Sequence, residues 1–195
     1  MCWYRVRIPK PWCKQRSSYS AMSRMRVLDL CTGTGAVGLS IAAARDDIAL
    51  ALSDVSESAL KVARANTEKL DLQARVQIVQ SDLFSALNDR AYDMIVCNPP
   101  YIPSADIATL APEVQHEPRL ALDGGEDGLV LCRKIVEGAP RHLVASASLL
   151  MEIGMGQADA LQEWISERTD LNMKWIDAIS DLNGVDRVVH LRRAS

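Results

Sequence analysis

The sequence lacks several features that would place it in other classes of protein. Its 195 residues include only three isolated histidines, and its five cysteines form no Cys-x-x-Cys pair, so we expect no metal site. No apolar run approaches the length that spans a membrane. The formal net charge of −3 offers no bulk attraction to nucleic acid. With 48% hydrophobic residues and no repeat, we expect one domain with one core, monomeric and in the reducing cytoplasm.

Acidic residues are absent from the first 26 positions, which hold seven basic residues and several serines. An organellar transit segment, a disordered tail and a truncated start share this composition, so an organellar location stays open. No amphipathic period is evident, which favours a truncated or non-native start. We therefore divide the chain into a basic segment, residues 1–25, and a domain, residues 26–195.

Short apolar runs alternate with helical stretches along the rest of the chain. Strands are predicted at Arg26–Leu30, Ile48–Ser53, Arg75–Gln80, Asp93–Cys97, Ser148–Ile153, Met173–Ile179 and Arg187–Leu191. Helices are predicted at Ala36–Ala44, Ser58–Leu70, Leu129–Glu137 and around Gln157–Arg168, with a long connection at Ile102–Gly128. This alternation predicts an α/β fold with a Rossmann-like, mostly parallel seven-stranded sheet, closed by an antiparallel hairpin around Leu182-Asn183-Gly184.

The segment Asn98-Pro99-Pro100-Tyr101 directly follows a predicted buried strand. Each proline keeps the residue before it out of the helical region, so the strand ends in a stiff extended corner. Ligands of open α/β sheets bind beyond the carboxyl ends of the strands, where this corner lies. The Asn98 amide and the Pro99 carbonyl could accept two hydrogen bonds from a planar –NH2 group, while Tyr101 covers its flat face. A plain turn is the alternative.

A glycine-rich turn, Cys31-Thr32-Gly33-Thr34-Gly35, joins the first predicted strand to the next helix. Glycines let the backbone approach a ligand closely. Together with Gly38, the glycines also satisfy a dinucleotide fingerprint. However, Asp29 ends the strand where a pyrophosphate would pass, and like charges there are unfavourable. Asp29 would suit the ammonium group of S-adenosylmethionine, so we expect this cofactor rather than NAD.

Two further aspartates follow the next two predicted strands. Asp54 could accept both hydroxyls of a ribose, or it could cap the following helix. Ser56 is also available as the cap, and we expect it to leave Asp54 free. Asp82, followed by Leu83, would face the exocyclic amine of adenine; a solvated turn aspartate is the alternative.

These motifs together resemble those of the protein-glutamine N5-methyltransferases, which modify release factors and, in a sister branch, a ribosomal protein. The resemblance covers roughly residues 27–193. It rests on Asp29–Gly35, Asp54, Asp82–Phe84, Asn98–Pro103, Glu117–Gly128, Leu150–Gly154 and Asp181–Arg187. Asn-Pro-Pro-Tyr is shared with DNA and RNA amino-methyltransferases, whereas the Glu117–Gly128 block is typical of the glutamine branch.

The resemblance implies the class I S-adenosylmethionine-dependent methyltransferase fold and methylation of the glutamine in a Gly-Gly-Gln motif of a peptide chain release factor. It implies that Asn98 and Pro99 are catalytic, because they would hold the substrate amide. The expected cofactor-binding residues are Asp29, Cys31, Thr32, Gly33, Thr34, Gly35, Asp54, Asp82, Leu83 and Asn98. The expected substrate-binding residues are Asn98, Pro99, Pro100, Tyr101 and Glu117.

Some of these residues have a simpler interpretation. Tyr101 could plug the edge of the core, and Glu117 could form a surface ion pair with Arg119 instead of orienting the substrate backbone. Two other functions also stay open. One is an amino-methyltransferase acting on nucleic acid, or on another protein such as a ribosomal protein, and the other is a catalytically weak cofactor-binding remnant.

The chain departs from the resembled family in two places. Family members carry an N-terminal helical domain, a strand ending in an Ile-Pro-Arg-Pro-like motif, and an acidic helix. Here Arg7-Ile8-Pro9-Lys10-Pro11 is similar to that motif, but Trp12-Cys13-Lys14-Gln15-Arg16 replaces the acidic start of the helix. Further along, Ser146-Ala147-Ser148 stands where the family often has a glycine-rich turn.

Overall fold

The computed structural model describes residues 24–87 and 91–195. The predictions about Arg7–Pro11 and Trp12–Arg16, and almost all of the predicted segment 1–25, lie outside the described residues. The described residues contain every predicted strand and helix, so the predicted architecture can be compared element by element.

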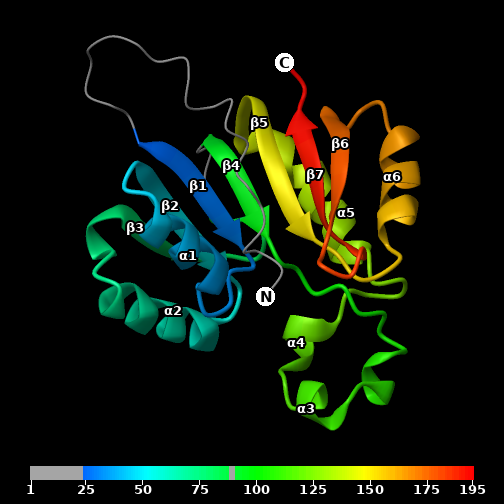
Figure 1. The fold of residues 1–195 in the computed structure, drawn as a ribbon, viewed down its shortest axis with the longest axis horizontal. Coiled ribbons are helices and arrows are strands. Elements are labelled where there is room, and N and C mark those ends of the chain that lie inside the picture. Colours follow the sequence, from blue (N-terminus) through cyan, green and yellow to red (C-terminus); the bar gives the residue numbers. More distant parts are fainter. Residues whose placement is uncertain (1–23, 88–90) are drawn as a thin grey trace.

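Seven strands form one sheet in the order β3-β2-β1-β4-β5-β7-β6 (Figure 1). They are β1 (Met25–Leu30), β2 (Ile48–Asp54), β3 (Val76–Gln80), β4 (Tyr92–Cys97), β5 (Leu143–Glu152), β6 (Met173–Ser180) and β7 (Asp186–Arg193). The first five strands run parallel, and β7 pairs antiparallel with both β5 and β6. The predicted mostly parallel sheet and its closing hairpin are confirmed.

Helices cover both faces of this sheet (Figure 1). They are α1 (Ala36–Ala44), α2 (Glu57–Lys69), α5 (Val130–Gly138) and α6 (Ala158–Ser166), with one-turn helices η3 (Gln73–Arg75) and η5 (Ala139–Arg141). Val27 of β1 packs in one cluster with Leu39 of α1, whereas its neighbour Leu28 packs in the other cluster with Ile135 of α5. Alternate side chains of a buried parallel strand thus enter two different layers. No helix among the described residues has both the length and the apolar character to cross a membrane.

Strand β5 starts five residues earlier than predicted, at Leu143 instead of Ser148. Its first half contains Ser146, whose φ of 61° lies in the left-handed region, and the pairing with β4 shifts register there. The prediction failed because Val144, Ala145 and Ser146 do not form an apolar run. A residue without β-branching at positive φ marks a bulge in the strand. Ser146 belongs to the segment Ser146-Ala147-Ser148, which stands where the resembled family often has a glycine-rich turn.

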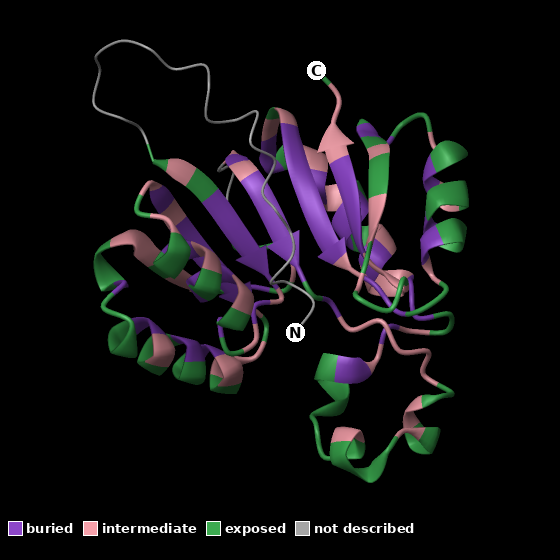
Figure 2. Ribbon diagram, viewed as in Figure 1, coloured by how far each residue is buried: buried purple, intermediate pink, exposed green. Residues whose placement is uncertain are grey.

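Residues 102–128, which we call the arm, project beyond the carboxyl ends of the parallel strands (Figure 1). The sequence predicted only a connection here, but the arm contains η4 (Ile107–Thr109), α3 (Pro112–Gln115) and α4 (Arg119–Leu122). Helices this short have no apolar period that a sequence pattern could show. Most of the arm is exposed (Figure 2). It closes on itself where Ile102 pairs with Asp123 in a parallel bridge.

Candidate functional site

A cleft of about 860 Å³ lies beyond the carboxyl ends of β1 to β4 and is bounded on its outer side by the arm. This volume falls in the range typical of small-molecule sites. The predicted site residues that line it are Asp29, Cys31, Thr32, Gly33, Thr34, Asp54, Asp82, Leu83, Asn98, Pro99, Pro100, Tyr101 and Glu117. Gly35 does not line the cleft; it is buried at the start of α1. The structure therefore brings together residues from positions 29 to 117 of the chain.

The turn after β1 is held by a buried carboxylate. Oδ2 of Asp29 accepts hydrogen bonds from Oγ1 of Thr32 (2.6 Å) and from the backbone N–H of Gly38 (2.8 Å). Gly33 and Gly35 have φ of 56° and 83°, which glycine adopts without strain. Burial raises the pKa of Asp29 to about 6, against the lowering effect of these two hydrogen bonds. The carboxylate expected to meet a cationic ligand thus also fixes the turn after β1.

Asp54 is the last residue of β2, and it is not free as predicted. Ser56 does cap α2, since its side chain accepts from the backbone N–H of Ala59 (3.3 Å). However, Oδ1 of Asp54 accepts from the N–H of Ser56 and Oδ2 from the N–H of Gly33, both at 2.8 Å. These bonds tie the turn after β1 to the turn after β2. Each carboxylate oxygen can accept a second hydrogen bond, so Asp54 keeps the capacity to hold two hydroxyls.

Asp82 and Leu83 lie at the cleft in the turn that follows β3. Asp82 is exposed, and its backbone carbonyl accepts from the N–H of Ser85. Leu83 has φ of 46°, and its carbonyl accepts from Oγ of Ser81 (2.8 Å). The turn is therefore shaped by local bonds, while the Asp82 side chain points to no described partner and the Leu83 side chain lines the cleft.

The corner after β4 presents its polar groups to the cleft. Asn98 is exposed, while Pro99 is buried and Pro100 half-buried. The Tyr101 hydroxyl donates to Oε1 of Glu152 (3.3 Å), and burial, together with this carboxylate, raises the pKa of Tyr101. Tyr101 is thus held at the edge of the core, as the simpler interpretation predicted, and it lines the cleft as well. Asn98 is the polar side chain of the corner with the greatest freedom to meet a ligand.

Glu117 lies on the arm, exposed and lining the cleft. The ion pair predicted between Glu117 and Arg119 is wrong, because Nε of Arg119 pairs with Oδ2 of Asp123 at 3.0 Å. Asp123 also accepts from Ser104 and from the N–H of Gly125, and these bonds lower its pKa. Arg119 therefore stabilises the arm, and the Glu117 carboxylate stays available to the cleft.

All the charged side chains among the described residues that line the cleft are acidic. Among its described lining residues are four carboxylates, from Asp29, Asp54, Asp82 and Glu117, and no lysine or arginine. Such a lining attracts cationic ligands and disfavours phosphate groups. S-adenosylmethionine fits these hydrogen-bond acceptors, because it carries a sulfonium, an amine and a ribose but no phosphate. A dinucleotide does not fit, although the glycine spacing alone would allow it.

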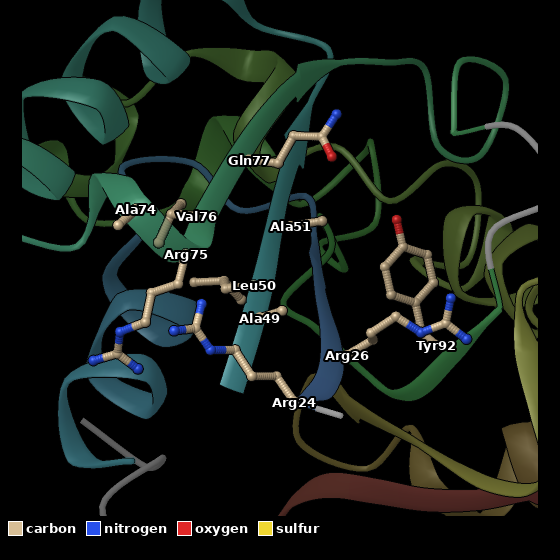
Figure 3. Close-up of a pocket in the computed structure, with 10 residues that line it drawn as sticks. All are labelled: Arg24, Arg26, Ala49, Leu50, Ala51, Ala74, Arg75, Val76, Gln77 and Tyr92. Carbon is tan, nitrogen blue, oxygen red and sulfur yellow. The ribbon is translucent and has the colours of Figure 1, made fainter. Parts of the chain in front are cut away.

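A second, smaller pocket of about 290 Å³ lies at the opposite, amino ends of β1 to β4. It is lined by Arg24, Arg26, Ala49, Leu50, Ala51, Ala74, Arg75, Val76, Gln77 and Tyr92 (Figure 3). None of the predicted site residues lies here. Within residues 24–87 and 91–195, no group of three or more His, Cys, Asp or Glu side chains could hold a metal ion.

Sequence reasoning missed two residues that bond to the corner, Glu152 and Gln157. Gln157 stands at the start of the helix predicted around Gln157–Arg168, and the sequence pattern gives it no other role. Its long side chain reaches back across 56 positions of the chain to Tyr101. A contact over that separation leaves no signal in the local pattern of residues.

The family model and the sequence relatives that match this chain are all methyltransferases. Residues 17–153 match the family described as "Methyltransferase small domain". The release factor glutamine methyltransferase of Gloeobacter violaceus is 40% identical over 165 residues, which are 84% of this chain and 57% of that protein. The ribosomal protein uL3 glutamine methyltransferase of Francisella tularensis is 38% identical over 82% of this chain and 49% of that protein. The chain thus spans about half the length of these two relatives.

A third relative covers more of both chains, and the solved structures agree on the fold. The release factor glutamine methyltransferase of Thermodesulfovibrio yellowstonii is 34% identical over 97% of this chain and 69% of that protein. A methyltransferase from Pyrococcus furiosus has a TM-score of 0.64 at 18% identity, covering 89% of this chain and 78% of its own. At that identity the structure supports the class I methyltransferase fold alone. By sequence, the chain belongs to the methyltransferase small domain family and to the family of the release factor glutamine methyltransferases.

Proposed function

We propose that the chain transfers a methyl group from S-adenosylmethionine to the side-chain amide nitrogen of a glutamine in a protein, the glutamine of a release factor Gly-Gly-Gln motif. The observation that carries the proposal is the corner Asn98–Tyr101. Asn98 is exposed, and Asn98 and Pro99 both line an acidic cleft that suits a cationic cofactor. The names of the relatives at 34–40% identity support glutamine as the substrate.

The cofactor would be held by the turns after β1, β2 and β3. S-adenosylmethionine, when bound, supplies a methyl group activated on a sulfonium. Asp54 would accept the ribose hydroxyls, residues 31–34 with Asp29 would hold the amino-acid end, and Asp82 with Leu83 would meet the adenine. The hydrogen bonds from Gly33 and Ser56 to Asp54 support this assignment, because they fix the carboxylate before any ligand arrives.

The corner has to overcome the weak nucleophilicity of an amide. The nitrogen lone pair is delocalised into the carbonyl, so it attacks poorly unless it is oriented. If the Asn98 side-chain oxygen and the Pro99 carbonyl each accept one N–H, the lone pair is directed at the methyl group. The proton can leave after transfer, so no strong base is needed. Positioning of this kind contributes up to about 7–11 kcal/mol to lowering a barrier.

The charge of the cleft argues against a nucleic-acid substrate. Asn-Pro-Pro-Tyr also occurs in nucleic-acid amino-methyltransferases, which flip a base into such a corner. The flanking phosphates would then approach four carboxylates, with no lysine or arginine among the described lining residues to neutralise them. A peptide carries no such charge, so a protein substrate fits the cleft better.

Incorporation of labelled methyl groups tests the proposal. The substrates are a Gly-Gly-Gln peptide, a release factor, protein uL3 and a single-stranded oligonucleotide, each with this chain and with the same chain fused to a helical N-terminal domain. We expect methylation of the peptide and the release factor, more strongly by the fusion. Methylation of the oligonucleotide alone, or cofactor binding without any transfer by either protein, would contradict the proposal, and the second result would favour the remnant.

A further inference from the structure

The corner after β4 has little support from its own backbone. Pro99 and Pro100 have no N–H, so two successive residues cannot donate hydrogen bonds to the surrounding structure. The chain is next fixed at Ile102, which donates to Leu122 of the arm and whose carbonyl accepts from Gly124. Between these points lies Tyr101. What holds the Tyr101 backbone therefore decides how firmly the two prolines and Asn98 are placed.

Gln157 holds the Tyr101 backbone with one end of its side chain and the loop after β5 with the other. Its Nε2 donates to the Tyr101 carbonyl (2.8 Å), and its Oε1 accepts from the N–H of Gly154 (2.8 Å). Both halves of the amide are used. Because β5 runs next to β4 in the sheet, the bridge ties the corner to the strand beside it.

Because the Gln157 side chain forms this bridge, it does not cap its own helix, α6. Gln157 occupies the N-cap position of α6, where Ser, Thr, Asp or Asn would accept a helix N–H. Its side chain makes no capping bond. Both polar ends of the Gln157 side chain bind outside α6, and the start of the helix has no side-chain cap. The role of Gln157 at this position is therefore the bridge and not the capping of α6.

Three glycines make room for the bridge. A Cβ added at Gly128 would lie 2.5 Å from Nε2 of Gln157 and would also collide with the Tyr101 carbonyl. A Cβ added at Gly124 would lie 2.8 Å from the carbonyl carbon of Tyr101, and one at Gly154 3.0 Å from Oε1 of Gln157. Gly124 and Gly128 belong to the segment Glu117–Gly128, and Gly154 ends the segment Leu150–Gly154. The two segments thus meet around the Tyr101 carbonyl and the Gln157 side chain that bonds to it.

We propose that Gln157 is a positioning residue for methyl transfer. It fixes the Tyr101 carbonyl, and through the stiff prolines it places the Pro99 carbonyl and the Asn98 amide against the substrate amide. The proposal rests on the proposed function, since the group that it places is the acceptor of the glutamine N–H. Gln157 does not line the cleft, and it acts only through the corner.

Gln157→Ala separates positioning from folding. We expect kcat for methyl transfer to fall by about 10- to 100-fold, the scale of a misplacement of about 1 Å, with cofactor affinity within about twofold of the parent. Gln162→Ala is the matched control, because Gln162 is exposed on the same helix. It should leave kcat and the melting temperature unchanged. A Gln157→Ala variant as fast as the parent would overturn the proposal, as would equal losses of cofactor binding and activity.

Gln157→Glu adds a pH readout that a purely structural residue would not give. A protonated carboxyl can donate to the Tyr101 carbonyl and accept from Gly154, as the amide does, whereas a carboxylate can only accept. The activity of Gln157→Glu relative to the parent should therefore rise as the pH falls from about 8 to about 4.5, toward the ordinary glutamate pKa of about 4.3. A ratio that stays flat over this range would contradict the donor role.

An NMR measurement keeps this inference separate from the proposed function. The Asn98 side-chain amide, labelled with ¹⁵N and assigned with Asn98→Ala, reports on the corner without turnover. We expect its resonances to shift or broaden in Gln157→Ala and to stay in place in Gln162→Ala. If the parent chain methylates nothing but the shift occurs, the proposed reaction fails and the bridge stands. If the parent methylates glutamine and Asn98 is unmoved by Gln157→Ala, the positioning role fails.

Discussion

The pockets at the two ends of strands β1 to β3 are lined by charged residues of opposite sign. At the carboxyl ends, Asp29, Asp54 and Asp82 line a cleft of about 860 Å³. At the amino ends, three arginines line a pocket of about 290 Å³, together with Ala49 and Ala51 of β2 (Figure 3). One set of strands therefore presents an acidic concave surface at one end and a basic one at the other.

The backbone differs between the two ends as much as the charge. Positive φ angles occur at Cys31, Gly33, Gly35 and Leu83 at the carboxyl ends, against Asp71, ahead of β3, on the amino side. The amino-end pocket is lined mostly by regular strand residues, and one of its arginines, Arg75, is bonded to the carbonyl of Arg45 and lies 3.5 Å from Asp46. Unusual backbone conformations concentrate where ligands bind. We infer that ligand binding depends on the carboxyl ends and that the amino ends serve the stability of the sheet.

The largest effect is expected from Asn98, at the carboxyl end of β4. Asn98→Ala should lower methyl transfer by about two to three orders of magnitude, the scale seen when one preorganised polar contact to a reacting group is lost. The melting temperature should stay close to the parent, because the side chain is exposed, and cofactor affinity should change little, because Asp29, Asp54 and Asp82 would supply the charged contacts to the cofactor. The measurement is transfer of labelled methyl to a Gly-Gly-Gln peptide, with cofactor affinity by calorimetry.

Asn98→Asp refines this result. A carboxylate still accepts hydrogen bonds, so part of the activity should return if acceptance of the amide N–H is the role of Asn98. An Asn98→Ala variant as active as the parent would show that the cleft is not the site of transfer, and the contrast between the two ends would lose its functional meaning.

A pH-dependent effect on stability is expected from Asp29. Its pKa is raised by burial from 3.8 to about 6, so between these values the folded chain binds more protons than the unfolded chain. Stability should therefore fall as the pH rises through this window. The shift corresponds to at most about 3 kcal/mol above about pH 6. Asp29→Asn keeps an oxygen for the Thr32 and Gly38 bonds and removes the charge.

Urea unfolding at a series of pH values measures this effect. The free energies of unfolding of parent and Asp29→Asn should agree near pH 4, separate between about pH 4 and about pH 6, and differ by a constant amount above that, with the variant more stable. Cofactor binding should weaken in the variant, because it loses a charge that favours a cation. Parallel pH curves for the two proteins would show that Asp29 is not the buried carboxylate that limits stability.

Variants at Asp54 and Arg26 compare the contributions of the two ends to cofactor binding. Asp54→Ala should weaken cofactor binding by about 1.5–3 kcal/mol through the loss of charge-assisted hydrogen bonds. Arg26→Ala, at the rim of the other pocket, should change it by less than about 0.5 kcal/mol. Calorimetry with S-adenosylhomocysteine gives both values. An equal loss in the two variants would mean that the arginine pocket contributes to the cofactor site.

Much of this arrangement could be predicted from the sequence, because it depends on local signals. Each parallel strand is a short apolar run that stops at a polar or turn residue, and the corner Asn98–Tyr101 stops β4 with two prolines. The rule that ligands bind at the carboxyl ends then placed Asp29 and Asp54 at one cleft, as the structure confirms. The hairpin of β6 and β7 followed from the turn at Leu182–Gly184.

Contacts between distant segments could not be predicted in this way. The bonds from Gly33 to Asp54 and from Gln157 to Tyr101 join residues 21 and 56 positions apart, and no periodicity records them. Short elements were missed as well, since α3 and α4 have four residues each. The partner of Arg119 was wrong because Asp123 lies one helical turn ahead and competes with Glu117.

The smallest effect is expected at Ser146, the one positive-φ residue near the amino end of β5, where the comparison assigns no function. A non-glycine residue in the left-handed region is strained, so Ser146→Gly should raise the free energy of unfolding by about 0.5–1 kcal/mol, less the entropy that glycine gains in the unfolded chain. Ala145→Gly, one position earlier and outside that region, should lower it by a similar amount. Urea unfolding measures both, and methyl transfer should match the parent in both. If Ser146→Gly is more stable but slower, strain at the amino ends also serves the reaction, and the division between the two ends of the sheet does not hold.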